Sequence, residues 1–133
     1  MPYWAKKKNS AQPTNSSMDF HIESFREYCL SKPFTTEEFP FDETTLVFKV
    51  HGKIFAMTDI FEFDGINLKC DPDRAIELRN AYDGVKPGYH ANKKHWNTVY
   101  FPSDIPQKLI WELIDHSYQC VWNGLPKSLR TSA

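Results

Sequence analysis

The segment Tyr89–Val99, which reads YHANKKHWNTV, holds the residues of this chain best suited to bind another molecule. Lys93 and Lys94 stand between two histidines, and Trp96 follows directly. No acidic residue occurs from Gly84 to Ser103. A local positive charge beside an aromatic ring is typical of a surface that holds phosphates or stacks on bases. The same segment is also compatible with a solvated loop that leads into an edge strand.

If the segment binds nucleic acid, its residues divide by chemistry. Lysine and arginine neutralise phosphates, asparagine amides can read base edges, and Trp96 or Tyr89 can stack on an unpaired base. We expect the nucleic-acid-binding set to be Lys86, Asn92, Lys93, Lys94, His95, Trp96, Asn97 and Arg79. Three or four phosphate contacts predict weak, salt-sensitive binding. Alternatively, the lysines protect an edge strand from pairing, and Trp96 packs on the sheet.

The sequence predicts no catalytic residue, no cofactor and no metal site. It contains no G-x-S-x-G elbow, no glycine-rich phosphate loop and no H-E-x-x-H. Cys29, Cys70 and Cys120 lie far apart in apolar segments, so we expect core thiols. His116 adjoins Asp115, but neighbouring helical residues point about 100° apart, which makes Asp115 a poor orienting group. We therefore expect a protein that is not an enzyme.

Composition and charge further restrict the class of protein to which the chain can belong. The chain has 133 residues, of which 41% are hydrophobic, and this predicts one globular domain. Residues 1–17 contain three lysines and no acids, and we expect a flexible polar tail followed by a single domain over 18–133. The rest of the chain has 13 basic and 17 acidic residues, the wrong overall sign for a dedicated nucleic-acid binder. The absence of a long apolar run or a secretory signal predicts a cytoplasmic protein that does not enter a membrane.

Three helices are expected from capping residues and apolar spacing. They are a helix over about 20–31 that Asp19 caps, a helix from Asp71-Pro72 to Gly84, and a helix that begins at a capping box of Asp104 and Gln107 and ends near Trp122. Residues 35–43 are expected to form a loop that Phe39 and Phe41 anchor to the core. Residues 125–133 are expected to be a short polar tail.

The strands are expected where the apolar period changes to two. They cover 45–50 and 53–60, joined by a His51-Gly52 turn, then 66–70, and finally about 96–101 after a turn at Lys86-Pro87-Gly88. The resulting order is α-β-β-β-α-β-α. This order predicts an α+β fold with an antiparallel sheet of about four strands packed against helices.

Long motifs in the chain resemble the MmcQ/YjbR family of small bacterial proteins. The resemblance covers about residues 20–130 and is carried by Phe39–Val50 (FPFDETTLVFKV), Leu68–Pro72 (LKCDP), Gly88–Val99 (GYHANKKHWNTV) and Leu113–Tyr118 (LIDHSY). It implies a frataxin-like (CyaY-like) fold that is also similar to type III secretion chaperones. It further implies DNA binding through a proposed double-wing arrangement of strands.

The same resemblance leaves a second function open, a protein-interaction module that takes up a peptide on an exposed sheet face or helix groove. The aromatic residues expected on such a surface are Phe61, Phe63, Tyr100 and Trp111. A weaker option is an iron role like that of frataxin, which would need the carboxylates of Glu23, Glu27, Glu37 and Glu38 on one face. We expect DNA as the partner, with a protein or peptide as the alternative, and a monomer.

Overall fold

The protein folds around one six-stranded antiparallel sheet in the computed structural model, which describes residues 20–88 and 91–130. The strands lie in the order β1-β2-β3-β4-β6-β5. Their bounds are β1 Thr35–Glu38, β2 Thr45–Val50, β3 Lys53–Asp59, β4 Gly65–Lys69, β5 Val85–Pro87 and β6 Trp96–Tyr100. The predicted α+β class and the antiparallel meander of β2, β3 and β4 are confirmed. The predicted strand count of four is wrong, because β1 and β5 add one short strand at each edge.

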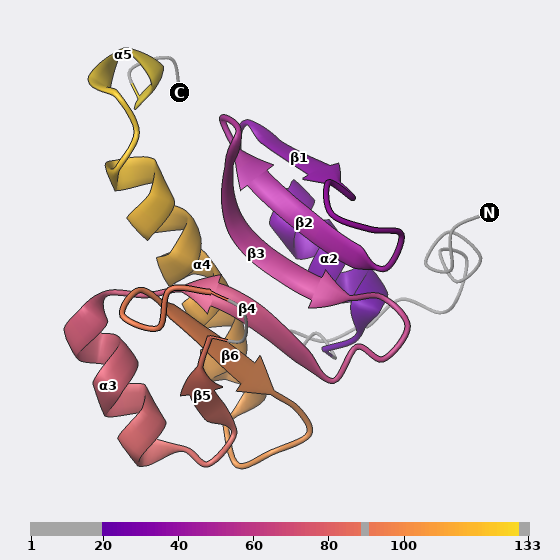
Figure 1. The fold of residues 1–133 in the computed structure, drawn as a ribbon, viewed down its shortest axis with the longest axis vertical. Coiled ribbons are helices and arrows are strands. Elements are labelled where there is room, and N and C mark those ends of the chain that lie inside the picture. Colours follow the sequence, from indigo (N-terminus) through magenta and orange to yellow (C-terminus); the bar gives the residue numbers. More distant parts are fainter. Residues whose placement is uncertain (1–19, 89–90, 131–133) are drawn as a thin grey trace.

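Four helices accompany the sheet in the described part of the chain: α2 Ile22–Leu30, α3 Pro72–Ala81, α4 Gln107–Asn123 and α5 Lys127–Arg130. Helices α2 and α4 lie behind the sheet in Figure 1, and α3 lies beside the β5–β6 end. In the described part of the chain, no helix covers the other face of the sheet. No helix in the described ranges is both long and apolar enough to cross a bilayer.

The core lies between the sheet and these helices, and strand alternation selects its members. Leu46, Phe48 and Val50 of β2 point to the helix side and are fully buried. They meet the buried stripe of α2, where Phe25 packs edge-on against Phe48 with ring centroids 5.4 Å apart. The predicted burial of Cys29 is confirmed, as is that of Cys70, whereas Cys120 is half-buried.

A β-bulge in β3 changes the pairing at the middle of the sheet. Phe48 pairs with Ala56 and Lys49 with Ile54, so Phe55 is the extra residue. The Ser117 hydroxyl of α4 donates a hydrogen bond to the Phe55 carbonyl and accepts one from the Lys69 N–H at 2.8 Å. This single buried hydroxyl therefore joins α4 to both β3 and β4.

Several predicted boundaries are wrong for identifiable reasons. Residues 35–38 pair with β2 rather than forming a loop, and Phe39 and Phe41 are 41% and 65% exposed rather than anchored in the core. The predicted turn at Lys86-Pro87 is part of β5, because these residues pair with β6. Asp104 does not cap α4, whose N-cap is Pro106.

Other differences concern the helix ends. The predicted Asp19 cap lies outside the described residues, and the His21 side chain caps α2 instead. Asp71 caps α3 as predicted, but this helix ends at Ala81, three residues before Gly84. The expected tail after Gly124 instead contains the buried Leu125 and α5.

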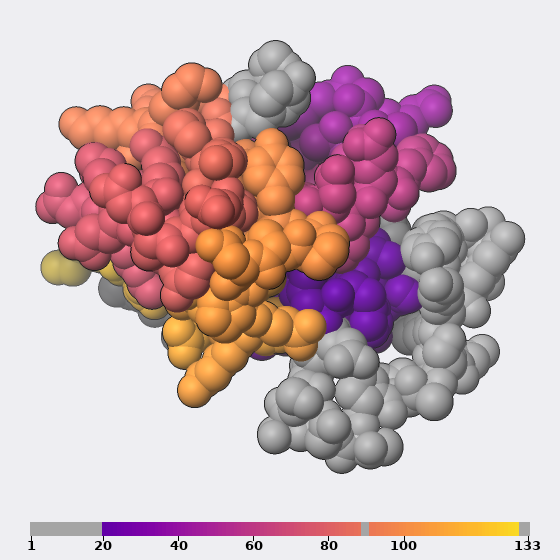
Figure 2. All heavy atoms as spheres, turned by 90° about the horizontal axis from the view of Figure 1, so that it is seen from below, coloured from indigo at the N-terminus to yellow at the C-terminus, as the bar shows by residue number. Residues whose placement is uncertain are grey.

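An aromatic cluster holds the first described residue in place. The ring of Phe20 lies within 4.7–5.6 Å, between centroids, of Phe63, Phe101 and Trp111. The Asp104 carboxylate accepts hydrogen bonds from the backbone N–H groups of Asp83 and Gly84, which follow α3. The segment after β6 (orange) therefore lies between α3 (rose) and α2 (indigo), as Figure 2 shows.

Candidate nucleic-acid interface

The uncovered face of the sheet is here called the open face. It carries the side chains of each strand that point away from the core. The register places Met57 opposite Asn67, Asn67 opposite Thr98, and Lys69 opposite Trp96. These side chains alternate with the core residues, so they point away from α2 and α4. The open face faces the viewer in Figure 1.

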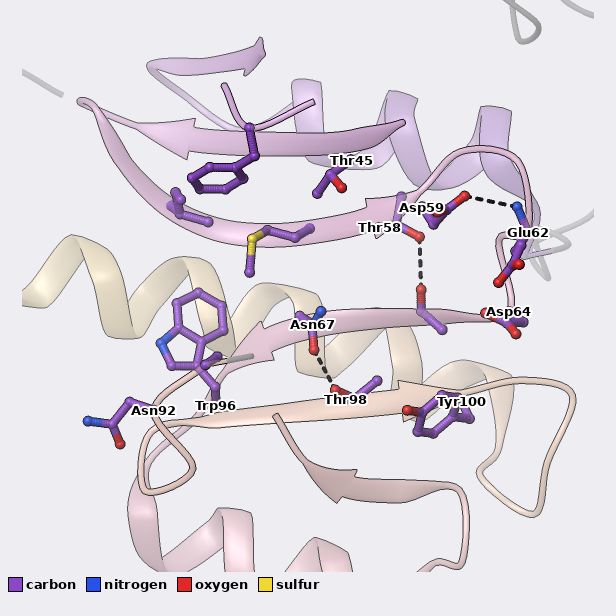
Figure 3. Close-up of a pocket in the computed structure, with 15 residues that line it drawn as sticks. Thr45, Thr58, Asp59, Glu62, Asp64, Asn67, Asn92, Trp96, Thr98 and Tyr100 are labelled. Atoms are coloured by element: carbon purple, nitrogen blue, oxygen red, sulfur yellow. Dashed lines mark hydrogen bonds between the residues drawn. The ribbon is translucent and has the colours of Figure 1, made fainter. Parts of the chain in front are cut away.

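A trough of about 790 Å³ lies on the open face. Its acidic end is formed by Asp59, Glu62 and Asp64 around the β3–β4 turn. Its other end is formed by Ile54, Met57 and Trp96. Figure 3 shows Trp96 and Asn92 at one end and the three carboxylates at the other, with Asn67 and Thr98 hydrogen-bonded between them.

A second hollow of about 600 Å³ adjoins the trough at the Trp96 end. Its lining includes the strand lysines Lys49, Lys53 and Lys69, together with Trp96 and the exposed Phe41. We call this the basic hollow. Lys49 lies one residue before the end of β2, Lys53 begins β3 and Lys69 ends β4, so the charge of the open face changes sign along the strand direction.

The three lysines differ in how far their charge is already balanced. The Lys49 ammonium lies 3.0 Å from a Glu38 carboxylate oxygen, which pairs with it across β1 and β2. Over residues 20–88 and 91–130, Lys53 and Lys69 form no ion pair. Two uncompensated ammonium groups beside an aromatic ring give the basic hollow the chemistry of an anion site.

The loop of residues 91–95 leads into Trp96, which lines the basic hollow, and Arg79 holds this loop from the helix side. The guanidinium Nε donates to Asn97 Oδ1 at 2.6 Å, and Nη2 donates to the Lys93 carbonyl and to the Trp96 carbonyl. Arg79 thus fixes the backbone of the loop through Nε and Nη2. Asn92 acts locally as well, because its side chain accepts the Lys94 N–H at 2.9 Å.

Asn97 is a correction to the predicted set. It lies on the helix face of β6, is only 2% exposed, and donates to the Ala75 carbonyl while accepting from Arg79. A buried amide with both groups bonded is not available to a base edge. Asn97 therefore helps Arg79 to position the loop.

The remaining predicted residues are placed at the surface. Lys93 and Lys94 are exposed, as is Lys86 on β5, while His95 and Trp96 are half-buried. Trp96 stands over the open face and lines both hollows, so it packs on the sheet and still borders open space. Tyr89 and His90 lie outside the described residues.

Sequence reasoning missed Lys49, Lys53 and Lys69. They lie on three strands, and only the register of the sheet brings them to one hollow. The sequence did contain a signal for Lys49: it alternates with the core residues Phe48 and Val50 and therefore points out of the core.

The histidine and cysteine side chains that could support catalysis make structural contacts. His116 Nε2 accepts the Asp71 N–H at 3.1 Å and lies 3.4 Å from Cys120 Sγ. Burial, with a smaller effect of Arg74, lowers the pKa of His116, so its imidazole is neutral near pH 7. Burial raises the pKa of the Cys70 thiol to about 11. Among residues 20–88 and 91–130, no three metal-ligating side chains come together.

The fold defines a small α+β protein with helices on one side of a single antiparallel sheet and a polarised open face on the other. A family model described as YjbR matches residues 30–120. The chain belongs to the YjbR family.

Its relatives are bacterial. The chain is 40% identical over 108 residues to the uncharacterised protein YbdF of Escherichia coli O157:H7, covering 79% of this chain and 87% of YbdF. It is 34% identical over 110 residues to the uncharacterised protein YjbR of Escherichia coli K12, covering 82% and 93%. A Deinococcus radiodurans crystal structure matches with a TM-score of 0.78 and 41% identity over 83% of this chain and 85% of that one.

Proposed function

We propose that this protein is a non-enzymatic DNA-binding protein that holds the phosphate backbone at the basic end of the open face. The observation that carries the proposal is the basic hollow, which lysines from three strands line together with Trp96. The resemblance to a family described as DNA-binding supports the same conclusion. The binding is weak and non-specific, because phosphates carry no sequence information.

The loop extends this surface beyond the sheet. Lys93 and Lys94 are exposed and precede His95 and Trp96 in the chain, and Trp96 itself lines the basic hollow. Arg79 holds the loop backbone from the helix side. A loop fixed in this way presents its lysines with little ordering cost on binding.

The salt dependence follows from the number of free lysines. Five lysines are exposed or border the hollow without an ion pair in the described part of the chain: Lys53, Lys69, Lys86, Lys93 and Lys94. If each neutralises one phosphate, log K falls with log salt with a slope of about −4.5. Affinity then drops roughly 500-fold between 50 and 200 mM salt.

The test is a titration of a fluorescent DNA duplex at several salt concentrations. We expect Lys53→Gln/Lys69→Gln and Lys93→Gln/Lys94→Gln each to reduce the slope by about 1.8. The matched control is Lys32→Gln/Lys108→Gln, which removes the same charge from the helix side and should leave the slope unchanged. Equal slopes for all three double variants would refute the proposed interface.

The alternative function, peptide uptake, would use the trough instead. Of the aromatic residues expected on such a surface, Phe61 and Tyr100 are exposed, whereas Phe63 and Trp111 are partly buried against the core. Capture of protein partners from nuclease-treated lysate, with no binding of the duplex at low salt, would favour this alternative over DNA.

A further inference from the structure

The acidic end of the trough lies at the opposite end of the open face from the proposed DNA site and has no role in that site. Glu62 and Asp64 are exposed and Asp59 is half-buried. In the described ranges none of the three carboxylates forms an ion pair. At its other end the trough is lined by apolar side chains, including Met57 and Ile54. The trough therefore has an unbalanced negative rim at one end and an apolar floor at the other.

From these features we propose that the N-terminal segment of the same chain binds in this trough, with the lysines at positions 6–8 on the acidic rim. Residues 1–17 contain no acid, and these three lysines equal the three carboxylates of the rim in number and are opposite in charge. Tyr3 and Trp4 precede the lysines and supply apolar surface of the kind the trough floor can cover.

The place where the described chain begins supports this occupant. The Phe20 ring stacks on Phe63 with centroids 5.6 Å apart, and Phe63 stands between Glu62 and Asp64 in the sequence. The first described residue, to which the N-terminal segment is joined, therefore lies near the acidic rim.

The reach and the order of the residues also fit. Lys8 precedes Phe20 by twelve residues, and a chain of that length spans at most about 40 Å. Moving back from Phe20, the lysines come first and the Tyr3–Trp4 pair second. The trough has the same order, because the rim lies nearest Phe63 and the apolar end lies toward Met57 and Trp96. A tether this short gives an effective concentration of about millimolar, so modest contacts suffice.

The experiment places a spin label on the N-terminal segment of the full chain and requires no DNA. Ala5→Cys is labelled in a Cys120→Ser background, because Cys29 and Cys70 are buried. We expect the amide signals of Met57, Asn67 and Thr98 to lose most of their intensity at low salt and to recover at high salt. Signals from the outer side of α4, such as Glu112 and Gln119, should remain unchanged.

Charge reversal separates this contact from chance proximity. Lys6→Glu/Lys7→Glu/Lys8→Glu and Glu62→Lys/Asp64→Lys should each restore the lost signals, and the two sets combined should broaden them again. Asp59 is left intact because it accepts the N–H groups of Phe61 and Glu62.

Three outcomes would overturn the proposal, two of which concern the labelled protein alone. One is unchanged signals at low salt, and the other is broadening that persists in both reversed variants. Broadening of an unlabelled copy mixed with the labelled one would assign the trough to a second molecule instead, which also contradicts binding within one chain.

Discussion

Replacing Ser117 with alanine tests how the sheet beneath the basic hollow is held together. Ser117 is fully buried, and its hydroxyl bonds the Phe55 carbonyl and the Lys69 N–H. The β3–β4 ladder ends at the pair Ala56–Leu68, so these two backbone groups lie just beyond it. The substitution removes one oxygen and leaves both groups buried without a partner.

The magnitude follows from the two groups. An unsatisfied buried donor or acceptor costs about 1–3 kcal/mol, and partial relaxation gives a total of about 2–4 kcal/mol. For a domain of this size, about 4 °C per kcal/mol predicts a melting temperature about 8–16 °C lower. Lys69 also loses its anchor beside Trp96, so duplex affinity should fall with stability.

The assay is urea unfolding followed by circular dichroism, with Ser31→Ala as the matched control. Ser31 is exposed, and its hydroxyl donates only to the Tyr28 carbonyl of its own helix end, so its loss should change stability by about 0.5 kcal/mol or less. If Ser117→Ala unfolds at the same urea concentration as the parent protein with an unchanged slope, the bridging role is wrong.

Three further predictions concern the loop and pH. Arg79→Ala should weaken duplex binding several-fold without changing the salt slope, because Arg79 positions the loop and contacts no phosphate; a slope reduced by about one would contradict this. Gly88→Ala should destabilise the protein by about 1–3 kcal/mol in thermal unfolding, since a Cβ there would lie 2.7 Å from Trp96 Cβ; unchanged stability would disprove the clash. Because the pKa of His116 is lowered in the folded protein, His116 binds its proton more readily in the unfolded chain. The stability that neutral His116 contributes is therefore present above about pH 6.5 and is lost as the pH falls below that value. His116→Asn should flatten unfolding free energy between about pH 6.5 and 5, and a parallel decline in both proteins would refute that assignment.

The elements that the sequence predicts are those whose own residues carry the pattern. The hairpin around His51-Gly52 alternates clearly, and Asp71-Pro72 marks the start of α3. The strands it misses are β1 and β5. Their sequences, TTEE and VKP, have little apolar alternation, and they are strands only because a neighbour pairs with them. Such edge pairing is a tertiary effect that local spacing does not encode.

The residues of the candidate site also divide into those that the sequence predicts and those that it does not. Lys93 and Lys94 were predictable because they are adjacent in the chain. The basic hollow was not, because Lys49, Lys53 and Lys69 meet only through the register of three strands. Asn97 was assigned to the wrong face because its neighbours' polarity hid the alternation of β6: Val99 faces the core, and Asn97, two residues earlier, faces it too.

The change of sign along the open face limits how a polyanion can lie on it. A duplex that runs parallel to the strands would pass from the lysines onto the carboxylates. It must therefore cross the strands β2, β3, β4 and β6 at their basic end. Three inter-strand spacings of about 4.8 Å span about 14 Å, the length of roughly four base pairs. One copy therefore occupies a very short footprint, and tight association with long DNA would require several copies side by side.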